Sequence, residues 1–378
     1  MNPLSVFSNN LGRLISFAEE KNIKKILVIE SSNQAWVSGT RINGSILSID
    51  LANKYVKYYT PALEYWRAES KISRLSLIKD FSVEVYAYLR YKIDLPENIR
   101  VFEGGYSEVL SKEISDCANR ENYCATDSYP QELRSFSEKL IDFKGYIADL
   151  RAVKSNEEIE FINRATEITM RALEKVVSEG VVGSSERILA GKLSYYIRLF
   201  GGDQEAFPLI VASNESSAYP HAEPRSRVIE TGDLVLFDVG TRYSEYNSDM
   251  TRIAVNNYSY SRYREIIEAV EEAVNRSIER IDVGVKASLV DNIARETLAR
   301  RGLAKYFIHS LGHGVGIDVH EKPYLSSNSN DVLDKNMVVT IEPGVYIRDL
   351  VGVRIEDLVV ISSRGPRILT SMKRVLEY

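Results

Sequence analysis

The chain has 378 residues, more than one hydrophobic core usually accommodates, so two domains are expected. With 44% hydrophobic and 27% charged residues, the composition is that of an ordinary globular protein and excludes disordered, collagenous and disulfide-rich classes. A formal net charge of −5 and the absence of a long basic run argue against a nucleic-acid partner, and no apolar stretch is long enough to span a membrane. The first residues lack the pattern of a signal peptide, which favours a cytoplasmic protein.

The first 150 residues show an α/β pattern. Residues 25–29 and 44–49 are apolar runs typical of buried strands, whereas residues 81–95 carry apolar side chains at helical spacing. Residues 115–131 have the composition of a loop and end beside a Tyr-Pro turn signal. No constellation of catalytic residues is visible in this part of the chain.

Both cysteines, Cys117 and Cys124, fall in that polar loop. No histidine lies nearby that would complete a zinc-type ligand set. We therefore expect two ordinary thiols on a surface segment, with a disulfide or a metal role as the alternatives.

The character of the chain changes near residue 150. Ser155, followed three residues later by Glu158, forms a capping box and predicts the start of a long helix. The boundary between the two domains is expected just before this helix, which gives a first domain of residues 1–150 and a second of residues 151–378. The apolar stripe of the helix would consist of Ile159, Ile162, Ala165, Ile168, Ala172 and Val176.

The second domain contains an internal repeat. Residues 231–240 align with residues 335–344 as strand-like runs that each end in an acid, one further residue and a glycine. After a turn, each run is followed by a second strand that carries another acid. The repeat therefore predicts two matching hairpins with two acids each: Asp238 and Asp249 in the first, Glu342 and Glu356 in the second.

Histidines cluster between the two hairpins, where His309, His313 and His320 lie within twelve residues of sequence. The fourth histidine, His221, precedes the first hairpin in a turn-rich loop. An acid inside an apolar strand is costly to bury unless it is paired or bound to a metal. Any one of the four acids could be solvent-exposed or paired with Lys or Arg, but the whole set, with glycines beside His313, predicts a metal site.

The donor set indicates the kind of metal and reaction. Carboxylates with one imidazole suit Mn, Co, Fe or Zn in a bridged pair better than a structural thiolate zinc. Two such ions can share a water molecule, lower its pKa and polarise a carbonyl group. The predicted reaction is hydrolysis.

The segments that carry these residues resemble those of the pita-bread metallopeptidases, the family of prolidases, Xaa-Pro aminopeptidases and methionine aminopeptidases. The likeness runs from about residue 150 to the C-terminus, and the first part is similar to the creatinase-like domain of prolidases and Xaa-Pro aminopeptidases. It implies an α+β fold in which a creatinase-like α/β N-terminal domain precedes a pita-bread catalytic domain with an internal pseudo-twofold repeat. The matching segments are Leu236-Phe237-Asp238-Val239-Gly240, Ser248-Asp249-Met250-Thr251-Arg252, Gly312-His313-Gly314-Val315-Gly316, Ile341-Glu342-Pro343-Gly344 and Arg354-Ile355-Glu356-Asp357.

The resemblance implies the metal ligands. Asp238 would bind one ion, Asp249 and Glu356 would bridge the two ions, and His313 and Glu342 would bind the other. Glu342 would also carry the proton of the attacking water as general base and then acid.

The resemblance also implies residues around the metals. His221 and His320 would face the substrate and hydrogen-bond the scissile amide or its oxyanion. His309 matches a further substrate-pocket histidine, although a satisfied histidine under the loop explains it equally well. Arg354 would support the ligand carboxylates from behind, with a surface charge as the alternative, and strand alternation places it on the same face as Glu356.

By resemblance, the chain would cleave the peptide bond before proline with two divalent ions per subunit, Mn or Co by preference and Fe or Zn as alternatives, and would form a homodimer. An Xaa-Pro dipeptidase is favoured because the N-terminal domain is short, and an Xaa-Pro aminopeptidase acting on longer peptides is the alternative. Many prolidases have an arginine soon after the Val-His-Glu string, whereas this chain has Lys322 there and no arginine before Arg348. A non-catalytic binding protein or a metal-free creatinase-like amidinohydrolase is disfavoured because no ligand is missing.

Overall fold

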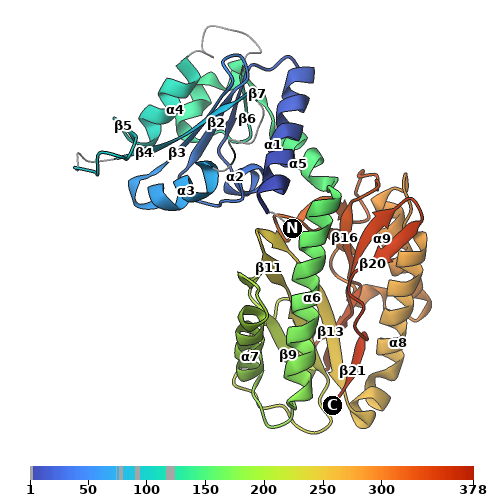
Figure 1. Cartoon of the computed structure of the whole chain (residues 1–378). Coiled ribbons are helices and arrows are strands. Elements are labelled where there is room, and N and C mark those ends of the chain that lie inside the picture. Colours follow the sequence, from blue (N-terminus) through green and yellow to red (C-terminus); the bar gives the residue numbers. More distant parts are fainter. Residues whose placement is uncertain (1–2, 74, 76–79, 90–93, 116–123) are drawn as a thin grey trace. The chain divides into compact units, whose positions relative to one another are not determined.

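A computed structural model of the chain describes residues 3–73, 75, 80–89, 94–115 and 124–378 (Figure 1). The chain divides into two compact units, Met1–Arg151 and Ala152–Tyr378, which we call unit 1 and unit 2. Among the described residues, no helix has both the length and the apolar character needed to cross a membrane.

Unit 1 is built on a sheet whose described strands follow the order β5-β4-β3-β2-β1-β6-β7. Strand β2 pairs antiparallel with β1 and β3, and the remaining neighbours pair in parallel. Parallel neighbours need crossover connections, and helix α3 provides the one between β3 and β4. The strands are β1 (Lys25–Val28), β2 (Ile46–Asp50), β3 (Tyr55–Pro61), β4 (Ser82–Tyr88), β5 (Val101–Phe102), β6 (Cys124–Thr126) and β7 (Leu140–Asp142), and the helices are α1 (Pro3–Glu20), α2 (Ser31–Ser38), α3 (Tyr65–Ile72), α4 (Tyr106–Ser115) and α5 (Lys144–Ala152).

The helix expected over residues 81–95 is wrong, because residues 82–88 form strand β4. This strand pairs in parallel with β3 over seven residues, from Ser82 opposite Tyr55 to Tyr88 opposite Pro61. Its Val, Tyr and Ala side chains fit the pleated sheet, and this tertiary pairing overrides the helical spacing. Residues 90–93 of the predicted helix lie outside the described residues.

The expectation of ordinary surface thiols is also wrong. Cys124 begins strand β6, is fully buried and is joined in a disulfide. Cys117 lies outside the described residues. Strand β6 pairs in parallel with β1, so a short Cys-Ala-Thr run within a polar stretch of sequence belongs to the core of unit 1.

Unit 2 begins with the capped helix that the sequence predicts. The Ser155 hydroxyl accepts a hydrogen bond from the Glu158 backbone N–H at 3.2 Å, and the Glu158 carboxylate accepts one from the Ser155 backbone N–H at 2.7 Å. Helix α6 then runs over Asn156–Ser178, and all six residues of the predicted apolar stripe are buried.

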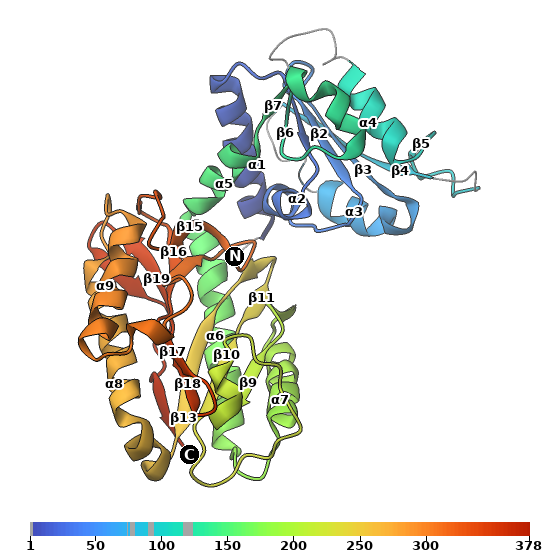
Figure 2. The same ribbon diagram turned by 180° about the vertical axis from the view of Figure 1, so that it is seen from behind.

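Two copies of one arrangement make up most of unit 2, as Figure 1 and Figure 2 show from opposite sides. The first copy has two helices and the strand neighbours β13-β10-β9, and the second has two helices and the strand neighbours β19-β16-β14. Within each copy a second small hairpin extends the main strand pair, β11–β12 in the first and β17–β18 in the second.

The elements of the first copy are α6 (Asn156–Ser178), α7 (Glu186–Leu199), β8 (Gln204–Glu205), β9 (Ile210–Ser213), β10 (Val235–Val239), β11 (Thr241–Tyr243), β12 (Tyr246–Asn247) and β13 (Met250–Val255). Those of the second copy are α8 (Asn257–Arg280), α9 (Ala287–Arg300), β14 (Gly312–Gly314), β15 (Glu321–Leu325), β16 (Val338–Ile341), β17 (Gly344–Ile347), β18 (Val351–Arg354), β19 (Asp357–Ser362) and β20 (Gly365–Ile368). The last strand, β21 (Val375–Glu377), returns to pair in parallel with β13 of the first copy.

Side chains on the two faces of β10 pack in different hydrophobic cores. Val235, Phe237 and Val239 pack with α6 and α7, whereas Leu236 packs with the α8 and α9 core. Because side chains alternate along a strand, Asp238 lies on the same face as Leu236. The first acid of the site therefore faces the second copy of the repeat.

Candidate metal centre

The four predicted acids lie at equivalent points of the two copies. Asp238 is in β10 and Asp249 immediately precedes β13, while Glu342 immediately follows β16 and Glu356 immediately precedes β19. Strands β10 and β13 pair with Val239 opposite Met250, and β16 and β19 pair with Ile341 opposite Asp357. Each copy therefore places its two acids at the same end of one antiparallel strand pair.

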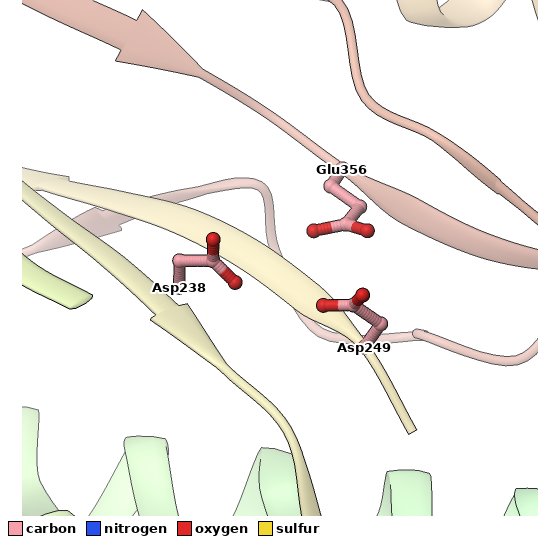
Figure 3. Close-up of side chains that lie close together, drawn as sticks. All are labelled: Asp238, Asp249 and Glu356. Atoms are coloured by element: carbon pink, nitrogen blue, oxygen red, sulfur yellow. The ribbon is translucent and has the colours of Figure 1, made fainter. Parts of the chain in front are cut away.

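Three of these acids converge, as Figure 3 shows. Oxygen atoms of Asp238, Asp249 and Glu356 all lie within 4.8 Å of one another. Asp249 and Glu356 are buried, and Asp238 is half-buried. Among the described residues, Asp238 Oδ1 and Glu356 Oε1 are buried and have no hydrogen-bond donor. Buried carboxylate oxygens without a donor are costly, and a bound cation would satisfy them.

His313 and Glu342 complete the cluster. The His313 Nε2 atom lies 3.1 Å from Glu342 Oε1 and 3.8 Å from Asp249 Oδ2. The other ring nitrogen, Nδ1, lies 3.2 Å from the Gly314 carbonyl oxygen, and this contact orients the ring so that Nε2 faces the acids. Thr340 donates to Glu342 Oε1 at 3.1 Å and accepts from the His313 backbone N–H at 3.0 Å.

The glycines beside His313 are required by close backbone contacts. A Cβ atom on Gly312 would lie 2.0 Å from the Thr340 carbonyl oxygen, and one on Gly314 would lie 2.1 Å from the Lys322 carbonyl oxygen. Neither glycine has a left-handed backbone conformation. Glycine at these positions can serve close backbone approach or an unusual backbone dihedral, and here only close approach to the neighbouring strands β16 and β15 requires it.

The electrostatics of the cluster favour a cation. Burial and the neighbouring carboxylates raise the pKa values of Asp249 and Glu356 well above their usual range. Burial also raises the pKa of Asp238, against the opposing charge of Arg354. Burial opposes ionisation of Glu342 too, but the hydrogen bond and charge of His313 lower its pKa to about 2. Too many buried carboxylates meet for the local cations to neutralise.

The residues present fit a pair of divalent metal ions. The donor set is four carboxylates and one imidazole, and two of its oxygens have no hydrogen-bond partner in the part of the chain that the structure describes. Such oxygen-rich donors match Mn, Co, Fe or Zn and do not match a thiolate zinc site.

Arg354 lies behind the acids at the end of β18. Its guanidinium contacts Asp238 Oδ2 at 2.6 Å and donates to Thr251 Oγ1 at 3.1 Å. Thr251 in turn donates to Glu356 Oε2 at 2.8 Å. Arg354 is buried and is therefore not a surface charge, and it reaches Glu356 through Thr251.

Two residues of this network were missed from the sequence, Thr251 and Tyr346. The Tyr346 hydroxyl is buried, accepts from Arg354 at 2.7 Å and lies 3.0 Å from His309 Nε2. Threonine and tyrosine in predicted strands usually pack in a core or face solvent. Only their position close to a predicted acid could have suggested a role here: Thr251 lies two residues after Asp249, and Tyr346 lies four residues after Glu342.

The remaining histidines lie around the acids. The His320 ring is exposed and stands edge-on to the His313 ring, with 4.3 Å between ring centroids. His309 is half-buried, and its two ring nitrogens contact the Ser310 carbonyl and the Tyr346 hydroxyl. His221 is exposed and follows Pro220, whose carbonyl accepts a hydrogen bond from Arg354 at 3.2 Å.

The pKa values of two of these histidines are lowered. Loss of hydration, and then the charge of His313, lower the pKa of His320, with His221 adding to the effect. Burial lowers the pKa of His309. Both shifts favour the neutral imidazole, a form that can donate or accept a hydrogen bond.

Known proteins resemble this chain over most of its length. Residues 160–363 match the model of metallopeptidase family M24. An Xaa-Pro dipeptidase of Pyrococcus furiosus is 36% identical over 367 residues, which cover 97% of this chain and 99% of that protein. The chain belongs to metallopeptidase family M24, whose members use divalent metal ions.

Solved structures extend the likeness to the fold of both units. An X-Pro aminopeptidase from Thermotoga maritima has a TM-score of 0.83 and 29% identity, covering 97% of this chain and 99% of that chain. A prolidase from Pyrococcus furiosus has a TM-score of 0.77 and 34% identity, covering 95% and 100%. The predicted family and the predicted α+β fold with a pita-bread C-terminal domain are confirmed.

Proposed function

We propose that the chain is an Xaa-Pro dipeptidase that hydrolyses the peptide bond before proline with two divalent metal ions. One observation carries the proposal: three acids from two copies of a repeat bring oxygen atoms within 4.8 Å of one another, and two of these oxygens have no donor among the described residues. The Xaa-Pro dipeptidase relatives support the substrate class, because they are 33–36% identical over nearly the whole chain.

We assign the metals to Asp238, Asp249, His313, Glu342 and Glu356, with Mn or Co as the preferred ions. When bound, the pair would supply Lewis acidity and a water of lowered pKa. Asp249 and Glu356, the most buried acids, would be shared between the ions. Their position at the meeting point of the two copies supports this assignment.

We assign proton transfer to Glu342. Its side chain is 16% exposed, compared with 13% for Asp238 and 7% for Asp249, so solvent reaches it at least as well as these two acids. The Thr340 hydroxyl holds Oε1 in place, and a carboxylate kept ionised can accept a proton and then return it.

We assign substrate contacts to His320, His221 and His309. The exposed His320 ring stands beside His313, and a neutral imidazole can hydrogen-bond the scissile amide or its oxyanion. His309 is the most constrained of the three, since Tyr346 and Ser310 occupy both ring nitrogens. We therefore expect His309 to contribute to the shape of the pocket more than to proton transfer.

An Xaa-Pro aminopeptidase is the second candidate, favoured by the TM-score of 0.83 with the Thermotoga maritima enzyme. The decisive measurement is kcat/KM for Ala-Pro against the same peptide extended by one and two residues. A preference for the dipeptide supports the proposal, and a preference for the longer peptides favours the aminopeptidase. Failure of the protein to bind about two metal ions, or to cleave any proline peptide, would refute both.

Unit 1 has no metal cluster among its described residues, and we propose that it is the creatinase-like N-terminal domain, with unit 2 as the catalytic domain. Solved relatives that cover 95–97% of the chain support this assignment. By resemblance we further propose a cytoplasmic homodimer, which light scattering of the purified protein would test.

A further inference from the structure

The two copies of the repeat meet at a seam between Thr251 and Glu356. The Glu356 backbone N–H donates to the Thr251 carbonyl at 3.2 Å, and the Thr251 hydroxyl donates to Glu356 Oε2 at 2.8 Å. One backbone contact and one side-chain contact therefore fix the Glu356 carboxylate relative to strand β13, next to Asp249. Any slip of this seam would separate the two acids assigned to both ions.

A buried arginine holds the seam from the opposite face of β13. Arg252 is 0% exposed and pairs in register with Phe237, whose side chain lies on the α6 and α7 side of the sheet. Its guanidinium donates to the Thr251 carbonyl at 3.0 Å and also to the Glu356 carbonyl. One terminal nitrogen, Nη1, thus binds both main-chain carbonyls that flank the seam, which leaves the other arm of the guanidinium free for further partners.

Asp357, the residue after Glu356, balances the charge of this arginine. Arg252 contacts Asp357 Oδ1 at 2.9 Å, and Arg374 contacts Asp357 Oδ2 at 2.6 Å. The Thr370 hydroxyl donates to Asp357 Oδ1 at 2.7 Å, so the carboxylate is fully engaged. A buried guanidinium is tolerable only with such partners.

The C-terminal segment supplies the remaining partners of the Arg252 guanidinium. The second terminal nitrogen of Arg252 donates to the carbonyl oxygens of Thr370 and Met372, at 3.0 and 3.2 Å. Strand β21 then pairs with β13 beside it. The segment from residue 369 to residue 377, which contains none of the predicted ligands, is therefore tied to the backbone that carries Glu356.

We propose that Arg252, together with Asp357 and the C-terminal segment, is a positioning residue for the metal centre. It acts through the backbone of Thr251 and Glu356 and touches neither metal nor substrate. Residues that orient a ligand commonly change metal affinity by about 10–100-fold when they are replaced. This inference rests on the proposed function, since it requires metals at Asp249 and Glu356.

The test measures metal binding directly by titrating Mn²⁺ into protein stripped with a chelator and following the heat released. Arg252→Lys keeps the charge but loses the planar fork, and we expect it to weaken binding of at least one of the two ions by about 10–100-fold. Leu298→Ala, in the buried α8 and α9 core, is the matched control. It should lower the thermal midpoint and leave both Mn²⁺ affinities unchanged, because it removes packing far from the seam in sequence.

A folded Arg252→Lys protein that binds both ions as tightly as the wild type would overturn the inference. If Arg252→Lys does not fold, Arg374→Met decides, because Arg374 is partly exposed and supports the same Asp357 carboxylate. We expect a smaller loss of affinity there, and an unchanged affinity would again overturn the inference. A wild-type protein that binds no Mn²⁺ would instead refute the proposed function and, with it, the basis of this inference.

Discussion

Replacing Asp249 by asparagine should make the metal-free protein more stable. The change keeps the shape of the side chain and removes one charge from a cluster whose oxygens lie within 4.8 Å of one another. At that separation and an effective dielectric constant of about 20, each pair of charges repels by about 3 kcal/mol. Uptake of protons relieves part of this repulsion in the wild type, so we expect a gain of roughly 2–4 kcal/mol in the free energy of unfolding at pH 8.

The gain should depend on pH in a defined direction. Burial and the charge of Glu356 raise the pKa of Asp249 above its value in the unfolded chain. Ionisation of Asp249 therefore opposes folding, and the contribution of this group to the stability of the metal-free protein should be most favourable at low pH and decline as pH rises through the raised pKa. The advantage of Asp249→Asn should be absent near pH 4, where the unfolded aspartate is itself about half protonated, and should grow toward pH 8.

With bound metal, the wild type should become more stable than Asp249→Asn. A ligand that binds only the folded state stabilises it by about 2.7 kcal/mol at a concentration one hundred times its dissociation constant. Asp249→Asn loses a proposed bridging ligand and should gain little stability from Mn²⁺, whereas the wild type should gain the full amount.

The assay is urea unfolding of both proteins at pH 4 and pH 8, with a chelator and with Mn²⁺. Glu296→Gln removes one exposed carboxylate from α9 and serves as the control, which should leave the curves unchanged. The reasoning is refuted if Asp249→Asn is less stable than the wild type at pH 8 without metal.

Three further predictions concern substrate contacts, metal dependence and unit 1. His320→Ala and His221→Ala should each lower kcat by about 10²–10³-fold while metal content stays at the wild-type level, and loss of metal in either would contradict their assignment. Chelation should abolish hydrolysis, with recovery on adding Mn²⁺ or Co²⁺, so full activity in a sample free of metal by elemental analysis would be inconsistent with the metal centre. Glu113→Gln should lower the free energy of unfolding by about 3–5 kcal/mol, because Lys25, 2.7 Å away and 5% exposed, loses its carboxylate. Burial opposes ionisation of Glu113, but the charge of Lys25 outweighs it and lowers the pKa of Glu113. The stabilisation by this ion pair should therefore be present at pH 7 and disappear as pH falls below the usual glutamate pKa. Equal urea midpoints for the wild type and Glu113→Gln at pH 7 would contradict this prediction.

The candidate site could be predicted from the sequence because acidic residues are unusual in apolar strands. Asp238 and Glu342 end apolar strands, and the repeat of the same pattern about a hundred residues apart made an accidental match improbable. The start of α6 was equally readable, since the Ser155 and Glu158 capping box is a purely local signal.

Features that depend on tertiary contacts were not readable. Strand β4 owes its conformation to pairing with β3, and the burial of Cys124 depends on its pairing with β1. Tyr346 and Arg252 look like ordinary strand residues until the chain brings Arg354 to one and Asp357 to the other. The roles of Tyr346 and Arg252 depend on which residues lie beside them in the folded chain, and neither composition nor periodicity predicts those neighbours.

The division of the site between two copies of the repeat has a consequence for biosynthesis. Thr251 and Glu356, which hold each other at the seam, are 105 residues apart, and Arg354 lies 116 residues after Asp238. During translation, the first hairpin leaves the ribosome with two of the acids and none of the other three proposed ligands. The proposed binding site can be complete only after Glu356 has been made, so we expect metal loading to follow synthesis of the second copy rather than to guide the folding of the first.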